Sequence, residues 1–118
     1  MHEWANVEFC YLTTTGRRSG RPHTVEMWFG VHDGRLYLLS GGCDASDWVR
    51  NIQAEAAVIV RVGDQTRHGR ARVLEPDTDE DALARKLLVE KYEPIDKSDL
   101  TTWGRSSLPV VIELEGAF

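Results

Sequence analysis

The pattern of apolar and polar positions in the first forty residues predicts β-strands. The stretch 8–15 is rich in aromatic and β-branched residues, and the same character resumes over 23–31. The period of two in the second stretch is typical of one continuous strand. Asp33-Gly34 predicts a tight hairpin, after which 35–40 returns as the next strand. The pattern therefore predicts a meander of three strands.

Helical spacing appears twice in the remainder of the chain. The other predicted elements are a helix over 44–56, strands over 57–62 and 65–74, a helix from the acidic run 77–81 to Glu93-Pro94, a polar linker, and a final strand over 108–114. The apolar residues of the first helix recur at i, i+3 and i+4, and Asp44 or Ser46 can cap it. Acidic residues stabilise the positive end of a helix, so the acidic run is a helix start. This order predicts a small, mainly antiparallel β-barrel with helices outside.

Length, charge and cysteine usage narrow the class of protein. At 118 residues the chain is expected to be one domain, 1–118, with a core that needs no disulfide or metal. A net charge of −5 argues against nucleic acid or an anionic membrane as partner. The start Met1-His2-Glu3 does not resemble a signal peptide and no apolar run is long enough to span a bilayer, so we expect a cytoplasmic protein. Cys10 and Cys43 lack C-x-x-C spacing and the histidines lack metal-ligand spacing, which predicts no disulfide and no metal.

The turn between the first two predicted strands is the strongest candidate for binding. Within 12–22 it carries three arginines, Arg17, Arg18 and Arg21, between two glycines. Gly16 and Gly20 can take positive φ, so the intervening main-chain N–H groups can converge on an anion such as phosphate. Arginines then add charge-assisted hydrogen bonds. The alternative is a solvated basic turn that only keeps the hairpin soluble.

A glycine-rich loop after the third strand is the second candidate. Gly41 and Gly42 follow Ser40 and would let a planar ligand approach the main chain closely. On the helix that follows, Trp48 and Asn51 are neighbours one turn apart and can present a ring and an amide to one ligand. The alternative places Trp48 in the core and Asn51 in solvent.

Four segments, in order and with compatible spacing, resemble the deazaflavin-dependent nitroreductase family of the split β-barrel superfamily, which also holds flavin reductases and pyridoxamine-phosphate oxidases. They are 12–22 (LTTTGRRSGRP), 40–42 (SGG), 48–51 (WVRN) with 58–63, and 108–113 (LPVVIE). The resemblance covers nearly the whole chain. It implies a six- to seven-stranded antiparallel split β-barrel with two or three peripheral helices. It also implies hydride transfer from reduced coenzyme F420, an 8-hydroxy-5-deazaflavin with a phosphate-linked polyglutamate tail.

The resemblance also implies roles for individual residues. The phosphate and tail would be held by Gly16, Arg17, Arg18, Ser19, Gly20 and Arg21. The ring would be seated by Ser40, Gly41, Gly42, Trp48 and Asn51, with Trp28 and Tyr92 at positions that are often aromatic near the ring or substrate. His23 stands where the family often has another arginine, which lowers the affinity expected for the tail. Tyr92 is the candidate proton donor to the reduced substrate, with water as its rival.

These inferences lead to one principal hypothesis and three alternatives. The principal one is an F420H2-dependent reductase of the quinone, ene or nitro reductase type that passes a hydride to a quinone or an activated alkene. The first alternative is an oxidoreductase of the same fold that uses FMN or FAD, because one phosphate also satisfies the arginines. The others are a non-catalytic binding protein for a phosphorylated cofactor and a purely structural dimer module. A homodimer is a further expectation, since split barrels often pair.

Overall fold

Seven strands form one antiparallel sheet in the computed structural model, which describes residues 2–115 without the side chains of residues 2 and 3. In chain order the elements are η1 (His2–Asn6), β1 (Cys10–Thr15), β2 (Pro22–Met27), β3 (Gly30–His32), β4 (Arg35–Ser40), η2 (Cys43–Ala45), α1 (Asp47–Ala54), β5 (Ala57–Val62), β6 (Gln65–Val73), α2 (Asp79–Asp96), α3 (Thr101–Ser106) and β7 (Leu108–Leu114). The strand order is β2-β1-β5-β6-β7-β4-β3. The predicted domain also includes residues 1 and 116–118, which lie outside the described residues.

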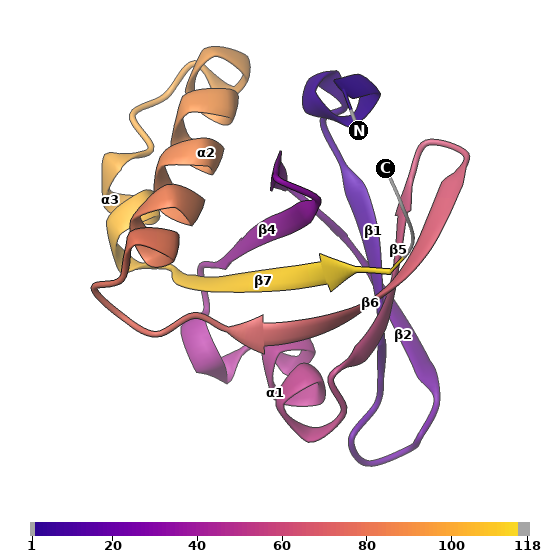
Figure 1. The fold of residues 1–118 in the computed structure, drawn as a ribbon. Helices are drawn as coiled ribbons and strands as arrows, with labels where there is room; N and C mark the ends of the chain where they lie inside the picture. Colours follow the sequence, from indigo (N-terminus) through magenta and orange to yellow (C-terminus); the bar gives the residue numbers. More distant parts are fainter. Residues whose placement is uncertain (1, 116–118) are drawn as a thin grey trace.

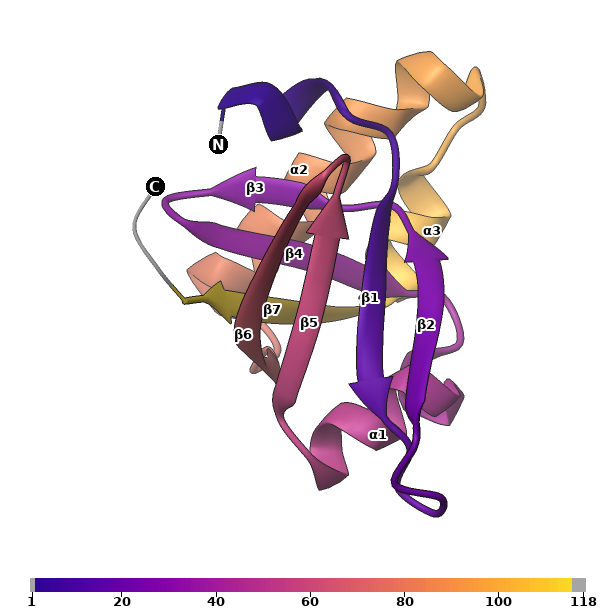
Figure 2. The same cartoon turned by 90° about the vertical axis from the view of Figure 1, so that its right-hand side faces the viewer.

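The sheet curls into a half-barrel with helices at its two ends, which confirms the predicted split β-barrel with peripheral helices. Figure 1 shows α2 and α3 packed together on one side of the curl, where α2 contacts β3, β4 and β7. Figure 2 shows α1 near the other end, beside the turn that joins β1 to β2. No helix of residues 2–115 is long and apolar enough to cross a membrane.

The long strand predicted over 23–31 is wrong, because the chain breaks at Trp28 and Phe29. On one side of the break β2 pairs with β1, and on the other β3 pairs with β4, so the two pieces lie at opposite edges of the sheet. Phe29 is fully buried, and its main-chain N–H donates to the Tyr92 hydroxyl at 2.9 Å instead of to a strand. A period of two continues across such a break and cannot reveal it.

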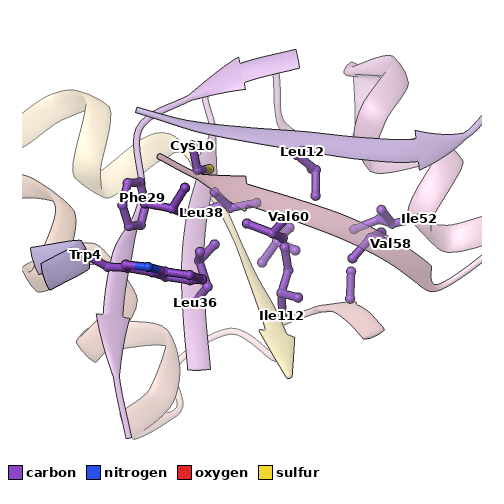
Figure 3. Close-up of a cluster of buried hydrophobic side chains, with 13 residues drawn as sticks. Trp4, Cys10, Leu12, Phe29, Leu36, Leu38, Ile52, Val58, Val60 and Ile112 are labelled. Carbon is purple, nitrogen blue, oxygen red and sulfur yellow. The ribbon is translucent and has the colours of Figure 1, made fainter. Parts of the chain in front are cut away.

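The interior of the half-barrel holds one hydrophobic cluster and the space under α2 holds another. Figure 3 shows the first cluster, in which Trp4 of η1 lies against Phe29 and Leu36 at one end of the barrel. The second cluster includes Leu88 and Tyr92 of α2. Five consecutive residues of β4, 36–40, are buried because this strand faces the barrel interior on one side and α2 on the other.

Two predictions for the C-terminal half were wrong: the residue at which α2 ends, and the absence of a helix from the polar linker that follows it. The acidic start is confirmed, since Thr78 caps α2 by accepting from the Asp81 N–H at 3.2 Å. The helix was expected to end at Glu93-Pro94, but it continues to Asp96 and ends at Lys97 in the left-handed conformation, φ 59°. Pro94 is exposed, so its ring and the N–H group that it lacks lie on the solvent side of the helix. The predicted polar linker contains the short helix α3, which has too few turns to show a helical period.

Candidate functional site

A pocket of about 490 Å³ lies between the β1–β2 turn and α1, and we call it the hairpin pocket. It is lined by Thr14, Gly16, Arg17, Arg18, Ser19, His23, Thr24, Val25, Asp47, Trp48 and Asn51. The pocket thus brings together residues of the basic turn and of the helix that sequence analysis selected separately. Figure 2 shows how the turn reaches past the ends of the strands to lie against α1.

Arg17 and Asn51 join the turn to α1. The Asn51 side chain is 4% exposed, and its Oδ1 accepts from the Arg17 main-chain N–H at 3.2 Å and from Arg17 Nη1 at 2.9 Å. Asn51 Nδ2 donates to Thr14 Oγ1 at 3.1 Å, and Arg17 Nη2 donates to Asp47 Oδ1 at 3.1 Å. Asn51 is therefore neither solvated nor free to bind a ligand by its carbonyl oxygen. It holds the turn in place.

The main chain of the turn uses most of its own N–H groups. Gly16 N–H donates to Arg21 O and Gly20 N–H to Gly16 O, each at 2.8 Å, and Arg21 N–H donates to Ser19 Oγ at 3.1 Å. Within this described turn, the main-chain N–H groups of Arg18 and Ser19 alone make no hydrogen bond. The predicted anion nest is therefore narrower than the six-residue turn, and centres on these two groups.

The two glycines of the turn serve different purposes. Gly20 has φ +71°, as predicted, which a residue with a side chain rarely adopts. Gly16 does not have positive φ. A Cβ on Gly16 would lie 2.6 Å from His23 Nε2, so this glycine is needed for the close approach of the imidazole.

The cations of the turn differ in how tightly they are held. Arg17 is fixed by Asp47 and Asn51, although the ion pair itself stabilises little because the Asp47 side chain is 85% exposed. Arg18, Arg21 and His23 are exposed, and Ser19 Oγ lies 3.4 Å from His23 Nε2. A fixed guanidinium beside the two exposed guanidinium groups suits a ligand that carries one anion at a defined place and further anions beyond it.

The glycine loop lies outside the lining of the hairpin pocket and fixes the start of α1. Ser40 is buried, and its Oγ donates to Cys43 O at 2.8 Å and lies 2.8 Å from Ser46 Oγ. A Cβ on Gly42 would lie 2.5 Å from Ser46 Oγ, so the loop needs glycine there. Gly41 is exposed and faces Trp103 of α3, whose Nε1 would be 3.5 Å from a Cβ on Gly41.

Trp28 and Tyr92 also lie outside the hairpin pocket. Trp28 stacks on Tyr92 with ring centroids 4.4 Å apart and meets Trp103 edge-on at 5.5 Å. Tyr92 is fully buried; its hydroxyl accepts from Phe29 N–H and donates to Glu8 O at 2.7 Å. Burial raises the pKa of this hydroxyl. The proton-donor role of Tyr92 stays a prediction, and this geometry favours a structural role.

Four lining residues were not predicted: Thr14, Thr24, Val25 and Asp47. Asp47 lies four residues before Asn51, so the helical period places both on the face that meets the turn, and this spacing was available from the sequence. The two threonines lie on strands whose register across the pocket could not be known. In residues 2–115, no group of three or more His, Cys, Asp or Glu side chains is placed to hold a metal ion.

Removing the Asn51 amide is expected to loosen the turn without unfolding the chain. Asn51→Ala leaves Arg17 N–H and Thr14 Oγ1 without their partner, so we expect anion affinity of the hairpin pocket to fall by about tenfold. Isothermal titration with pyrophosphate measures the change. Asn51→Asp keeps an acceptor for Arg17 but adds a negative charge beside the anion, so we expect its affinity to fall as well. Equal affinity in all three proteins would show that the amide does not position the turn.

Comparisons with known proteins place this fold and site in context. A family model described as F420H(2)-dependent quinone reductase matches residues 1–115. A solved F420-H2 dependent reductase, FDR-A, is 29% identical with a TM-score of 0.69, over 89% of this chain and 93% of that chain. A structure described as a domain-swapped dimer is 28% identical with a TM-score of 0.71, over 89% of this chain and 79% of that chain. HutZ, the heme storage protein from Vibrio cholerae, shares the fold at 16% identity with a TM-score of 0.72, over 98% of this chain and 88% of that chain. The search of curated proteins found no match.

Proposed function

The chain belongs to the F420H(2)-dependent quinone reductase family and is an F420H2-dependent reductase, and we propose that it reduces a quinone or an activated alkene. The predicted family and enzyme class are thereby confirmed. F420 supplies the hydride when it is bound. The protein's part is to bind and orient the two reactants and to exclude water from them.

The observation that carries the proposal is the anion-binding chemistry of the hairpin pocket. Arg17 is locked by Asn51 and Asp47, and the free N–H groups of Arg18 and Ser19 lie beside it. Arg18 is exposed in the lining of the pocket, and Arg21, which is outside the lining, extends the positive charge beyond it. A phosphate followed by several carboxylates fits this arrangement, because each anion has a cationic or N–H partner. We therefore assign the phosphate and tail to Gly16, Arg17, Arg18, Ser19, Gly20, Arg21 and His23.

We assign the ring to the region from Trp48 to the glycine loop. Trp48 lines the hairpin pocket, and Ser40, Gly41 and Gly42 lead into the same helix. Gly41 is exposed between this helix and Trp103, and Trp103 in turn contacts Trp28. Glycine main chain beside aromatic side chains suits a planar ring. Asn51 acts in this proposal through Arg17.

The single phosphate of FMN would leave the outer arginines without a partner, and this favours F420 over FMN. A fluorescence titration of the four tryptophans with F420, FMN and FAD tests the choice. We expect micromolar or tighter binding of F420 and at least about tenfold weaker binding of the flavins. The reverse order would support the flavin-using alternative.

The acceptor is tested on the same protein with reduced F420. A soluble benzoquinone, an enone and a nitroimidazole are compared by the rate of F420H2 oxidation, and we expect the first two to react faster. Tight F420 binding with no reaction toward any acceptor would support the non-catalytic alternative. Homodimerisation stays a prediction, for which light scattering with and without F420 is the test.

A further inference from the structure

A second pocket, of about 470 Å³, lies between η1, β3 and α2, and we call it the helix pocket. It shares no lining residue with the hairpin pocket. Its walls are mainly apolar, formed by Ala5, Val31, Leu87 and Ile95. Ile95 is 47% exposed, which is unusual for so large an apolar side chain. The pocket thus offers an open apolar surface that is separate from the hairpin pocket.

One cation, Lys91, lies in the wall of this pocket. Its Nζ donates to the main-chain oxygen of Phe29 at 3.0 Å and lies 3.8 Å from the centroid of the Phe29 ring. Among the side chains that the structure describes, no carboxylate forms an ion pair with Lys91. The ammonium group has three N–H donors, and the Phe29 oxygen uses one of them. Two N–H donors therefore remain without a hydrogen bond among the described residues.

The neighbours of Lys91 are two aromatic rings, Phe29 at 3.8 Å and Tyr92 at 5.1 Å from Nζ, and a main-chain oxygen, and none of them carries a negative charge. Burial lowers the pKa of the Lys91 ammonium to about 8. The nearby Cys10 thiol is neutral because burial raises its pKa to about 12, and burial likewise raises the pKa of the Tyr92 hydroxyl. Glu90 lines the pocket but is exposed, so its carboxylate stays hydrated. An anion placed against Nζ would replace the water that the ammonium has lost.

We propose that the helix pocket binds a small amphipathic carboxylate, with its carboxylate on Lys91 Nζ and its aryl or alkyl chain on the apolar walls. Charge complementarity and apolar area both favour this class of ligand over a neutral molecule or a hydrophilic anion. Glu90 opposes an anion, so its neutralisation is expected to tighten binding. The proposal does not rest on F420 binding or on the acceptor.

A pair of matched probes tests the proposal, 4-phenylbutyrate and 4-phenylbutanol, which differ in the charged group. We expect amide NMR shifts at the helix pocket, and phenylbutyrate to bind at least about tenfold more tightly. Binding of the anion must also raise the pKa of Lys91, because the ligand prefers the charged form. Lys86 and Lys97 lie on or directly after the same helix and serve as internal controls when the protein is made with lysine labelled with ¹³C at Cε, which leaves the ammonium group unmodified.

Variants separate the charge from the fold. Lys91→Met should remove the preference for phenylbutyrate, Lys91→Arg should keep it, Glu90→Gln should increase it, and Lys86→Met should leave it unchanged. Equal binding of the two probes, no saturable binding, or an unchanged preference in Lys91→Met would overturn the proposal. If Lys91→Met does not fold, two measurements on the wild-type protein test the proposal: the difference in affinity between the two probes, and the rise of the Lys91 pKa when phenylbutyrate binds.

Discussion

Replacing Arg17 and Arg18 together by alanine is expected to weaken F420 binding by about a hundredfold, because two charge-assisted contacts of about tenfold each are lost. Arg17 carries its guanidinium in a fixed position against Asn51 and Asp47, and Arg18 supplies an exposed one. Titration of intrinsic fluorescence measures the loss. The unfolding transition should change little, since both residues lie in the turn between β1 and β2 and belong to neither hydrophobic cluster.

The single variants and a matched control show where the loss arises. Arg18→Ala removes charge alone, whereas Arg17→Ala also removes the side-chain hydrogen bonds from the turn to Asn51 and Asp47 of α1. We therefore expect Arg17→Ala to bind F420 less tightly than Arg18→Ala does at every salt concentration. Arg70→Ala takes the same charge from an exposed position on β6 and should leave binding unchanged. If the double variant bound F420 as tightly as the wild type, the hairpin pocket would not be part of the cofactor site.

The elements that the sequence predicted well are those whose own residues determine them. The hairpin at Asp33-Gly34 needs positive φ at both residues, and both have it, 51° and 75°. The acidic start of α2 is likewise local, since Thr78 and the following acidic residues satisfy the helix terminus. The break at Trp28 and Phe29 was missed because the partner of the Phe29 N–H there is Tyr92, which lies 63 residues away in sequence.

The same distinction between local residues and distant contacts applies to the candidate site. The basic turn was predicted from its own residues, and Gly16 to Ser19 of it line the pocket, whereas Gly20 and Arg21 do not. That Asn51 is buried and bonded to Arg17 depends on how α1 meets the turn, which no helical period reports. The glycine loop was predicted to seat a ring, yet Ser40 and Gly42 are fixed by Ser46 and shape the start of α1. Local chemistry predicts which residues can bind, and packing decides which of them are free to do so.

Tyr92→Phe is expected to lower the free energy of unfolding by about 3 kcal/mol, because a buried hydrogen-bond partner is removed without being replaced. The Phe29 N–H and the Glu8 carbonyl both lose the hydroxyl. Phe29 O keeps Lys91 Nζ at 3.0 Å, so the N–H group carries most of the cost. Urea unfolding measures the free energy, and the melting temperature should fall by roughly 10 °C.

The same variant decides between a structural and a proton-donating Tyr92. A general acid contributes about a hundredfold or more to the rate, so its loss would lower kcat by that factor and change the pH profile. A structural Tyr92 predicts that folded Tyr92→Phe, assayed well below its melting temperature, keeps kcat within about twofold of wild type. Tyr37→Phe is the matched control, because its hydroxyl donates to Glu80, which Arg35 and Arg72 also bind. A large loss of kcat in Tyr92→Phe but not in Tyr37→Phe, with stability unchanged, would support Tyr92 as the proton donor.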